Sequence, residues 1–313
     1  MTSTPPAVSR GAAAAATTAT VVGIMAYNEA ENIERALRSV LSQTIADRIT
    51  RVIVVASGCT DATPDIVARL AAVEPRIILL REDDRCGKIR AINTFLAEID
   101  EPLVVMASAD LIMEPSTLAA LVAPLEDPAV GMVGAHPVPT NPRDTFVGFA
   151  VHLMWELHHR VSLRTPKMGE LVAFRNILAP LDPAVLADEV EVERQIRAAN
   201  FEIRYAPDAH VYNRGPAALS EFVEQRARWT AFNMHIARRF HIGVATLSSA
   251  NLARAAFSYV RDERPRLDWL AAAALLELWA RTRAYAMVLT RLVQRHAVWQ
   301  PLKSTKRVGR GPR

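Results

Sequence analysis

Two residues, Asp110 and Lys88, are of types and at positions that could bind a phosphate group. Asp110 follows the strongly hydrophobic segment 102–107, and a carboxylate at the end of a strand can hold Mg²⁺ or Mn²⁺ against phosphate oxygens. Lys88 follows Gly87 at the start of a predicted helix, where its ammonium group can neutralise a phosphate. Both residues also have ordinary roles, because a single Asp often forms a turn and a Lys at a helix start is often solvated.

Two adjacent carboxylates, Asp188 and Glu189, begin the predicted helix 187–199. Acidic residues near a helix N-terminus stabilise the helix through its dipole. One of them can instead act as a general base if it points into a ligand crevice. His210 can complete a metal site, although we favour a structural histidine at a strand end.

A predicted basic helix, 217–240, carries the sequence QRARW at 225–229. Arg228 lies three residues after Gln225, so the two side chains share one helix face. An arginine suits the oxygens of a diphosphate, and Trp229 can stack on a sugar ring. The same pattern is also compatible with a helix that faces lipid.

These residues need a scaffold, and the alternation of apolar segments and amphipathic segments predicts one. We expect strands at 20–26, 51–56, 76–80, 102–107 and 130–135, with helices at 30–42, 61–72, 88–96 and 117–125 between them. This order predicts βαβ units and a doubly wound, mostly parallel α/β sheet with helices on both faces. Ligands bind at the carboxyl ends of such strands. Tyr27, Asn28 and Glu29 follow the first strand there, and we expect Asn28 to cap the next helix.

The segments after residue 137 lose this alternation. We expect helices at 145–163, 187–199, 217–240 and 267–293, an extended segment at 169–176 and a short strand at 202–205. The predicted organisation is a disordered tail at 1–17, an α/β domain at 18–240, a helical C-terminal extension at 241–300 and a basic tail at 301–313.

Composition and charge narrow the class of protein. Of the 313 residues, 50% are hydrophobic and 22% charged, which is typical of a globular protein. Cys59 and Cys86 cannot form a disulfide framework, so we expect reduced thiols in a cytoplasmic protein. Residues 214–313 contain 18 Lys/Arg against 6 Asp/Glu, whereas residues 1–213 contain 19 against 27. The basic end is expected to face something anionic, and no segment is long and apolar enough to span a membrane.

In order and spacing, these pieces resemble the family 2 glycosyltransferases with the GT-A fold. The matching segments are VGIMAYNEAE at 22–31, IVVASGCTDAT at 53–63, GKIRAIN at 87–93, VVMASAD at 104–110, DE at 188–189 and QRARW at 225–229. They lie within residues 21–240, and EIRYAPDAHVY at 202–212 also resembles the family's strand after the acid pair. The resemblance implies an inverting transfer of a sugar from a nucleotide diphosphate sugar to a hydroxyl acceptor, assisted by Mn²⁺ or Mg²⁺.

The resemblance also assigns roles to residues. It places the nucleotide sugar against Ala26, Tyr27, Glu29, Ser57, Lys88, Ser108, Asp110, Arg228 and Trp229. Asp110 would hold the metal, and Glu189, or else Asp188, would be the catalytic base. Three positions depart from the family pattern: Ser57 stands where an acidic residue contacts uracil, Ser108 replaces the first Asp of Asp-x-Asp, and the acid pair is inverted.

Other functions stay open at this point. A non-catalytic nucleotide-sugar-binding protein would fit the lost acidic residues, whereas a nucleotidyltransferase would require a Gly-rich first loop that is absent. Nucleic acid is the least favoured partner, because it does not explain an acidic crevice. The segment 145–163 and the helices after 214 could rest on the inner face of the plasma membrane and collect a lipid-linked or cell-envelope acceptor. They could equally pack on the sheet as core.

Overall fold

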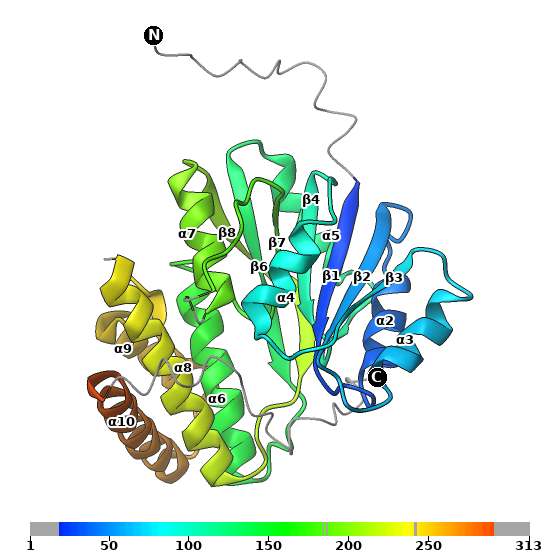
Figure 1. The fold of residues 1–313 in the computed structure, drawn as a ribbon. Helices are drawn as coiled ribbons and strands as arrows, with labels where there is room; N and C mark the ends of the chain where they lie inside the picture. The colour runs from blue at the N-terminus through cyan, green and yellow to red at the C-terminus, as the bar shows by residue number, and fades with distance from the viewer. Residues whose placement is uncertain (1–18, 184, 186, 241–242, 291–313) are drawn as a thin grey trace.

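The computed structural model describes residues 19–183, 185, 187–240 and 243–290. It contains an eight-stranded mixed sheet in the order β3-β2-β1-β4-β7-β6-β8-β5 (Figure 1). The strands are β1 (Thr20–Ala26), β2 (Ile49–Ser57), β3 (Ile77–Glu82), β4 (Leu103–Ser108), β5 (Ile112–Met113), β6 (Val130–Pro139), β7 (Leu171–Arg175) and β8 (Glu202–Asn213). The predicted tails at 1–17 and 301–313 lie outside the described residues.

The first four strands in sequence form a parallel half-sheet. β1 pairs with β2 on one side and β4 on the other, and β2 pairs with β3, all in parallel. The crossover helices are α2 (Ile33–Leu41), α3 (Thr63–Ala71) and α4 (Lys88–Leu96). All carboxyl ends of these strands therefore meet at one edge, as the sequence predicts.

Helices cover both faces of the sheet, and the side chains of β1 alternate between two cores. Val22 and Ile24 pack with α2, α3 and α5 (Thr117–Val122). Val21 packs on the other face with α4 and α7 (Asp188–Ala198). This alternation follows from the two-residue period of a strand and explains why the central strands are apolar throughout.

The second half of the sheet is mixed. β7 runs antiparallel between β4 and β6, while β6 and β8 are parallel. The predicted strand at 130–135 is therefore not the direct neighbour of 102–107. The predicted short strand at 202–205 is too short, because β8 pairs with β6 from Glu202 to Asn213. β5, only two residues long, was not predicted from the hydrophobic pattern.

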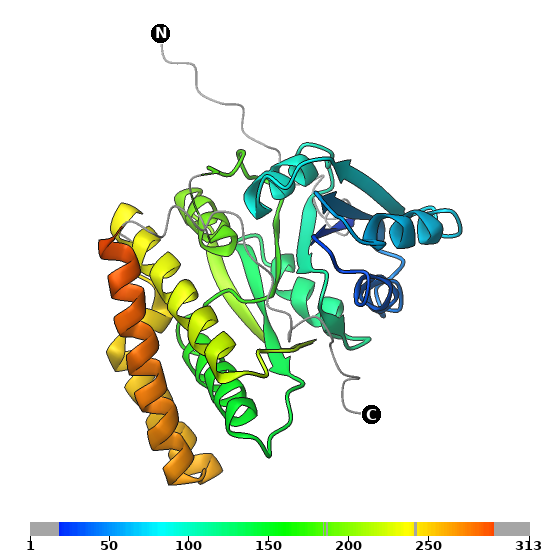
Figure 2. The same cartoon turned by 60° about the horizontal axis from the view of Figure 1, so that its bottom comes forward.

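The remaining helices form a separate layer beside the sheet (Figure 2). They are α6 (Phe146–Ser162), α8 (Leu219–Phe240), α9 (Ser249–Glu263) and α10 (Leu267–Leu289), with the short 3₁₀ turn η2 (Ala245–Leu247). A second 3₁₀ turn, η1 (Ala123–Glu126), directly follows α5 at the sheet. α8 is one continuous helix and α10 packs against it through Phe232 and Ala284. Among the described helices, none is long and apolar enough to cross a membrane.

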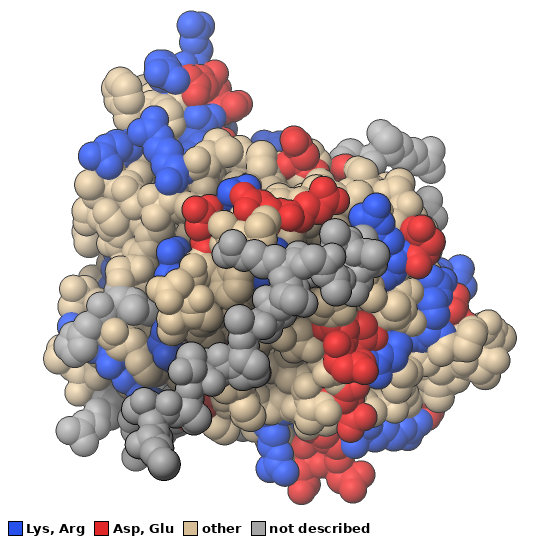
Figure 3. Space-filling model, turned by 90° about the horizontal axis from the view of Figure 1, so that it is seen from above, with Lys and Arg blue, Asp and Glu red and all other residues tan. Residues whose placement is uncertain are grey.

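Charge is mixed on the face at the end where β1 begins. Groups of Lys/Arg and groups of Asp/Glu alternate there, and neither sign covers the whole face (Figure 3). The charge asymmetry between the two parts of the chain therefore does not turn this face into a uniformly acidic or basic surface.

Candidate active site

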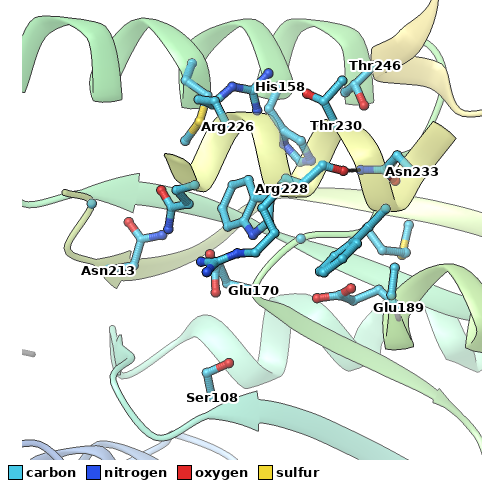
Figure 4. Close-up of a pocket in the computed structure, with 18 of the residues that line it drawn as sticks. Ser108, His158, Glu170, Glu189, Asn213, Arg226, Arg228, Thr230, Asn233 and Thr246 are labelled. Atoms are coloured by element: carbon cyan, nitrogen blue, oxygen red, sulfur yellow. Dashed lines mark hydrogen bonds between the residues drawn. The ribbon is translucent and has the colours of Figure 1, made fainter. Parts of the chain in front are cut away.

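A cavity of about 780 Å³ lies between the carboxyl ends of the parallel strands and the helical layer. Its walls come from the loops after β1, β2 and β4, from the start of α4 and α7, and from α6 and α8. Figure 4 shows Glu189 and Arg228 pointing into it from opposite walls. The topology thus gathers segments that are up to 200 residues apart in the chain (Ala26 and Arg228 both line the cavity).

The loop after β1 is fastened to the loop after β2. Asn28 adopts a left-handed conformation with φ 53°, and its side-chain oxygen accepts a hydrogen bond of 2.8 Å from the Thr60 backbone N–H. The Glu29 N–H donates to the Thr63 hydroxyl at 2.8 Å. The prediction that Asn28 caps α2 is wrong, because Asn28 bridges the two loops and the helix begins at Ile33.

The loop after β2 needs glycine at one position. Gly58 has φ +59°, and a Cβ placed there would lie 2.5 Å from the Arg85 backbone nitrogen. This close approach puts Arg85 above the loop, with its guanidinium 3.6 Å from the centre of the Tyr27 ring. Ser57 is buried and lines the same cavity as Tyr27 and Arg85. The loops after β1 and β2 therefore bring an aromatic ring and a serine hydroxyl to the cavity wall.

The two adjacent carboxylates of α7 have different surroundings. Asp188 is buried and forms an ion pair of 2.7 Å with Lys88, whose side chain is 42% exposed. Burial lowers the pKa of Lys88, but Asp188 and Glu189 outweigh burial and raise it. Burial and the charge of Asp188 raise the pKa of Glu189. Lys88 therefore remains an ammonium ion, and the Glu189 carboxyl group binds a proton more tightly than an ordinary glutamate does.

A third carboxyl group, Glu170, lies just before β7 in the same cavity. Burial, Asp110 and Glu189 together raise the pKa of Glu170 to about 8. Asp110 therefore lies close enough to influence Glu170 electrostatically. The Asn213 side chain contacts Glu170, and its buried oxygen Oδ1 accepts no hydrogen bond within the described part of the chain. Carboxylate and amide oxygens thus gather at the end of β4 and β8.

The opposite wall of the cavity comes from α8. Arg228 is buried, and its neighbour Trp229 packs edge-on against Trp155 of α6 with 6.0 Å between the ring centres. Because α8 lies along the mouth of the strand ends, its arginine reaches the same space as Lys88 and Asp110. The cavity therefore combines cationic groups with carboxylates, which is an arrangement suited to a charged phosphate ester and a proton transfer.

Residues 21–172 match the model of glycosyl transferase family 2. This chain carries a family 2 glycosyltransferase domain. The glycosyltransferase domain is similar to the mannosyltransferase PcManGT from Pyrobaculum calidifontis, whose structure was solved with GDP-Man and Mn²⁺. The two chains are 27% identical with a TM-score of 0.59, and the similarity covers 89% of this chain and 85% of that chain. The GT-A fold expected from the sequence is confirmed.

Two curated relatives come from Haloferax volcanii. Glycosyltransferase AglE is 28% identical over 168 residues, which are 54% of this chain and 52% of AglE. Glycosyltransferase AglD is 36% identical over 115 residues, which are 35% of this chain and 18% of AglD. The chain therefore spans about half the length of one curated relative and about a fifth of the other.

The glycosyltransferase domain brings the residues predicted from sequence into one place. The cavity is lined by Ala26, Tyr27, Glu29, Ser57, Lys88, Ser108, Asp110, Asp188, Glu189, Arg228 and Trp229. Their individual roles stay predictions. His210 is not among the lining residues: its Nδ1 lies 3.4 Å from the Glu114 carboxylate, and its ring is tilted by 57° to the His136 ring, with 5.2 Å between the ring centres. The favoured interpretation of His210 as a structural residue agrees with this placement.

Sequence reasoning missed other residues of the same cavity. Glu170 and Asn213 border strands β7 and β8, and Arg85 precedes the Gly87–Lys88 pair. Glu170 directly follows Gly169 before an apolar strand. Asn213 ends a strand that the hydrophobic pattern limits to 202–205, whereas the family resemblance extends it to residue 212. In both cases the available signal was a polar residue next to an apolar strand. For Asn213 this signal was missed because the hydrophobic pattern predicts a strand that is too short.

Proposed function

We propose that the protein transfers a sugar from a nucleotide diphosphate sugar to a hydroxyl acceptor with inversion at the anomeric carbon. The observation that carries this proposal is the position of Glu189, a carboxyl group with a raised pKa, in a cavity that also contains Lys88 and Asp110. The family match supports the class of reaction. A protein that only binds a nucleotide sugar would not require a carboxyl group such as Glu189 in the same cavity as Lys88 and Arg228.

Glu189 fits the role of base better than Asp188. Asp188 is engaged with Lys88 at 2.7 Å, so protonation of Asp188 would break an ion pair at the entrance of α4. Glu189 has a raised pKa and points into the cavity (Figure 4). A base whose pKa lies nearer to neutral pH accepts a proton more readily during the reaction. Asp188 is then a positioning residue that holds Lys88.

A divalent cation fits the oxygen atoms at the ends of β4 and β8. The described residues contain no group of three His, Cys, Asp or Glu side chains that could hold a metal ion unaided. The Asp110 carboxylate and the unpaired Asn213 Oδ1 are hard oxygen donors of the kind Mg²⁺ and Mn²⁺ prefer. These two residues would hold the cation together with diphosphate oxygens. The ion would supply charge stabilisation for the departing diphosphate.

The reaction balances with the residues at hand. Glu189 takes the proton of the acceptor hydroxyl, and the hydroxyl oxygen forms a bond to the anomeric carbon. The bond between that carbon and the phosphate oxygen breaks, and the nucleotide diphosphate leaves with the electron pair. Lys88 and Arg228 offset the negative charge that develops on the leaving group, which is the usual electrostatic contribution of such sites.

GDP-mannose is the first donor to test, because the similar mannosyltransferase was solved with it. Ser57, which stands where the family pattern has an acidic contact to uracil, is consistent with a base other than uracil. We also propose that the protein acts in the cytoplasm, at the inner face of the plasma membrane, in building a cell-envelope glycan. Exposed apolar and arginine side chains on α9 and α10 support contact with a membrane.

The test is release of GDP from GDP-mannose in the presence of Mn²⁺ and an acceptor, with NMR assignment of the product anomer. We expect the product to have the opposite anomeric configuration to the donor. Glu189→Gln should reduce transfer by a factor of about 10² to 10⁴, the usual contribution of a general base. Glu193→Gln is the matched control, because Glu193 lies on the same helix, pairs with Arg197 and does not line the cavity. Retained transfer by Glu189→Gln, or a product with retained configuration, would overturn the proposed mechanism.

A further inference from the structure

The cavity does not end at the residues assigned to the donor. It continues past Trp229 on α8 into a second space, which we call the helix-side chamber. Six apolar residues define this chamber: Met154 of α6, Leu247 of η2, Leu252 and Ala256 of α9, and Leu270 and Ala274 of α10. Figure 4 shows Arg226, Thr230 and Thr246 on this side of α8, away from Ser108 and Glu170.

The two parts of the cavity differ in chemistry. The part at the strand ends contains Lys88, Asp110, Glu170 and Glu189, whereas most residues of the helix-side chamber are aliphatic. A ligand that fills both parts must be polar at one end and apolar at the other, because burying apolar surface is favourable only against apolar walls. A simple sugar acceptor would leave the helix-side chamber filled with water.

A group of three charged side chains stands at the edge of the helix-side chamber. Glu277 of α10 accepts hydrogen bonds from Arg226 of α8 at 2.9 Å and 3.0 Å, and from Arg281 at 3.0 Å. Two guanidinium groups thus share one carboxylate, so the group carries one net positive charge. Guanidinium groups bind phosphate oxygens well. An anionic phosphate is therefore the matching partner at this point of the cavity.

α10 is apolar on two opposite faces. Leu270 and Ala274 face the helix-side chamber, while Leu275 and Trp279 on the outer face are 69% and 58% exposed. An amphipathic helix of a globular protein normally has one apolar face, and the outer one is then polar. α10 thus forms a wall of the helix-side chamber with one face and an exposed apolar surface with the other. The chamber therefore lies next to a surface that suits contact with lipid.

We propose that the helix-side chamber binds the hydrocarbon chain of a long-chain lipid acceptor, with the phosphate of its headgroup at Arg226 and Arg281. The headgroup hydroxyl then extends past Trp229 to Glu189. This inference rests on the proposed function and names the class of its acceptor. It explains the continuity of the cavity, its change from charged to apolar walls and the net positive charge at the boundary.

The test measures binding of three probes by calorimetry below their micelle concentrations: inorganic phosphate, butyl phosphate and dodecyl phosphate. We expect dodecyl phosphate to bind at least tenfold more tightly than butyl phosphate, since each buried methylene adds affinity. Ala274→Trp places an indole in the helix-side chamber and should remove this difference. Ala272→Trp, on the exposed outer side of the same helix, is the matched control and should retain it.

Three results would overturn the inference. They are equal affinity for butyl and dodecyl phosphate, equal loss in the two tryptophan variants, and binding of inorganic phosphate as tight as that of dodecyl phosphate. If Ala274→Trp fails to fold, Ala256→Trp on α9 fills the same space from the other side and decides the question. GDP binding with Mn²⁺, measured on the same samples, reports separately on the donor site. A protein that binds GDP but does not prefer dodecyl phosphate contradicts only the lipid inference, whereas a protein that does not bind GDP contradicts the proposed function.

Discussion

At the residue scale, Asp188 and Glu189 are adjacent in the chain, yet their carboxyl groups have different surroundings. Asp188 faces Lys88 across 2.7 Å, and Glu189 faces the cavity with a raised pKa. The residues alone predict that one of the pair is a base, and the family resemblance favours Glu189 while leaving Asp188 open. Their ranking depends on which side chain meets Lys88, and that is decided by the packing of α7 against the start of α4.

The two carboxyl groups should therefore respond differently to neutralisation. Asp188→Asn leaves Lys88 without its partner and should lower the free energy of unfolding at pH 7 by about 1 kcal/mol, since the pair is partly exposed. Glu189→Gln should instead raise the free energy of unfolding at pH 7, because the raised pKa of Glu189 means that its ionisation destabilises the folded state. Thermal unfolding of both variants checks this. At pH 4, the Glu189 carboxyl group of the folded wild type is protonated. The free energy of unfolding should then be the same for Glu189→Gln and the wild type.

Glu170 and Asn213 show the limit of prediction at this scale. The first is a lone Glu after a Gly, and the second is an Asn before an Arg. Nothing in their spacing relates either to Asp110, because β4, β7 and β8 become neighbours at the cavity only through a mixed sheet. A pattern based on βαβ units predicts parallel neighbours and misses residues that an antiparallel strand delivers.

At the scale of elements, one ion-pair group joins β2 to the start of β4. Arg51 donates hydrogen bonds to both oxygens of Glu101, and the Thr50 hydroxyl donates to Glu101 at 2.7 Å. Burial alone would raise the pKa of Glu101, but these hydrogen bonds outweigh it and lower the pKa to about 2. The Glu101 side chain is 8% exposed, so solvent screens this interaction only weakly.

Acid should therefore weaken the fold through Glu101. A carboxyl group with a lowered pKa stabilises the folded state above its usual pKa, and this stabilisation is lost as the pH falls from about 5 to about 2. Glu101→Gln should lower the free energy of unfolding at pH 7 by about 2 kcal/mol, and the difference from the wild type should shrink towards pH 2. Urea unfolding at several pH values measures both. A constant difference across that pH range would contradict the assignment.

A glycine in β1 fixes how closely α4 approaches the sheet. A Cβ at Gly23 would lie 2.6 Å from the buried ring of Phe95. Gly23→Ala should therefore lower the free energy of unfolding by about 1–3 kcal/mol through overpacking. Adding Phe95→Leu should make the effect of Gly23→Ala smaller in a double-mutant cycle. Additive effects of the two substitutions would show that the contact does not limit the packing of α4.

The parallel half of the fold was predictable, because apolar strands and amphipathic helices alternate there with short connections. α4 even begins and ends at the predicted residues, 88 and 96. The second half was predicted only in outline. The extent of β8 depends on pairing with β6 over its whole length, and α9 was expected only as part of a helical extension, without bounds of its own. Tertiary contacts, more than local sequence, determine those elements.

At the scale of the whole molecule, the helical layer places a largely apolar surface with exposed arginines beside the cavity. Phe257, Leu275, Leu278 and Trp279 are exposed on α9 and α10, Arg254 and Arg283 are exposed on the same helices, and Arg264 is exposed between them. Such a surface is suited to the interface of an anionic membrane. The sequence offered two interpretations of these helices, as membrane-facing elements or as core, and the outer residues of α10 are not part of the core.

Binding to vesicles should depend on both charge and apolar area. We expect co-sedimentation with vesicles that contain anionic lipid, and weaker binding as the salt concentration rises through the screening range. Leu275→Ser combined with Trp279→Ser should reduce binding at every salt concentration, whereas Val73→Ser, an exposed apolar residue at the far end of the sheet, should not. Absence of binding at any salt concentration would reject a membrane role for this surface.

The central claim is that the cavity holds a nucleotide diphosphate sugar through a divalent cation at Asp110. The most direct measurement is the thermal unfolding midpoint with GDP, UDP and ADP, each with and without Mn²⁺, for the wild type and Asp110→Asn. A ligand that binds only the folded state raises this midpoint with concentration. We expect the unfolding midpoint to rise by several °C with one nucleotide. The rise should occur only with Mn²⁺ and should be lost in Asp110→Asn. No increase with any nucleotide, or an unchanged increase in Asp110→Asn, would contradict it.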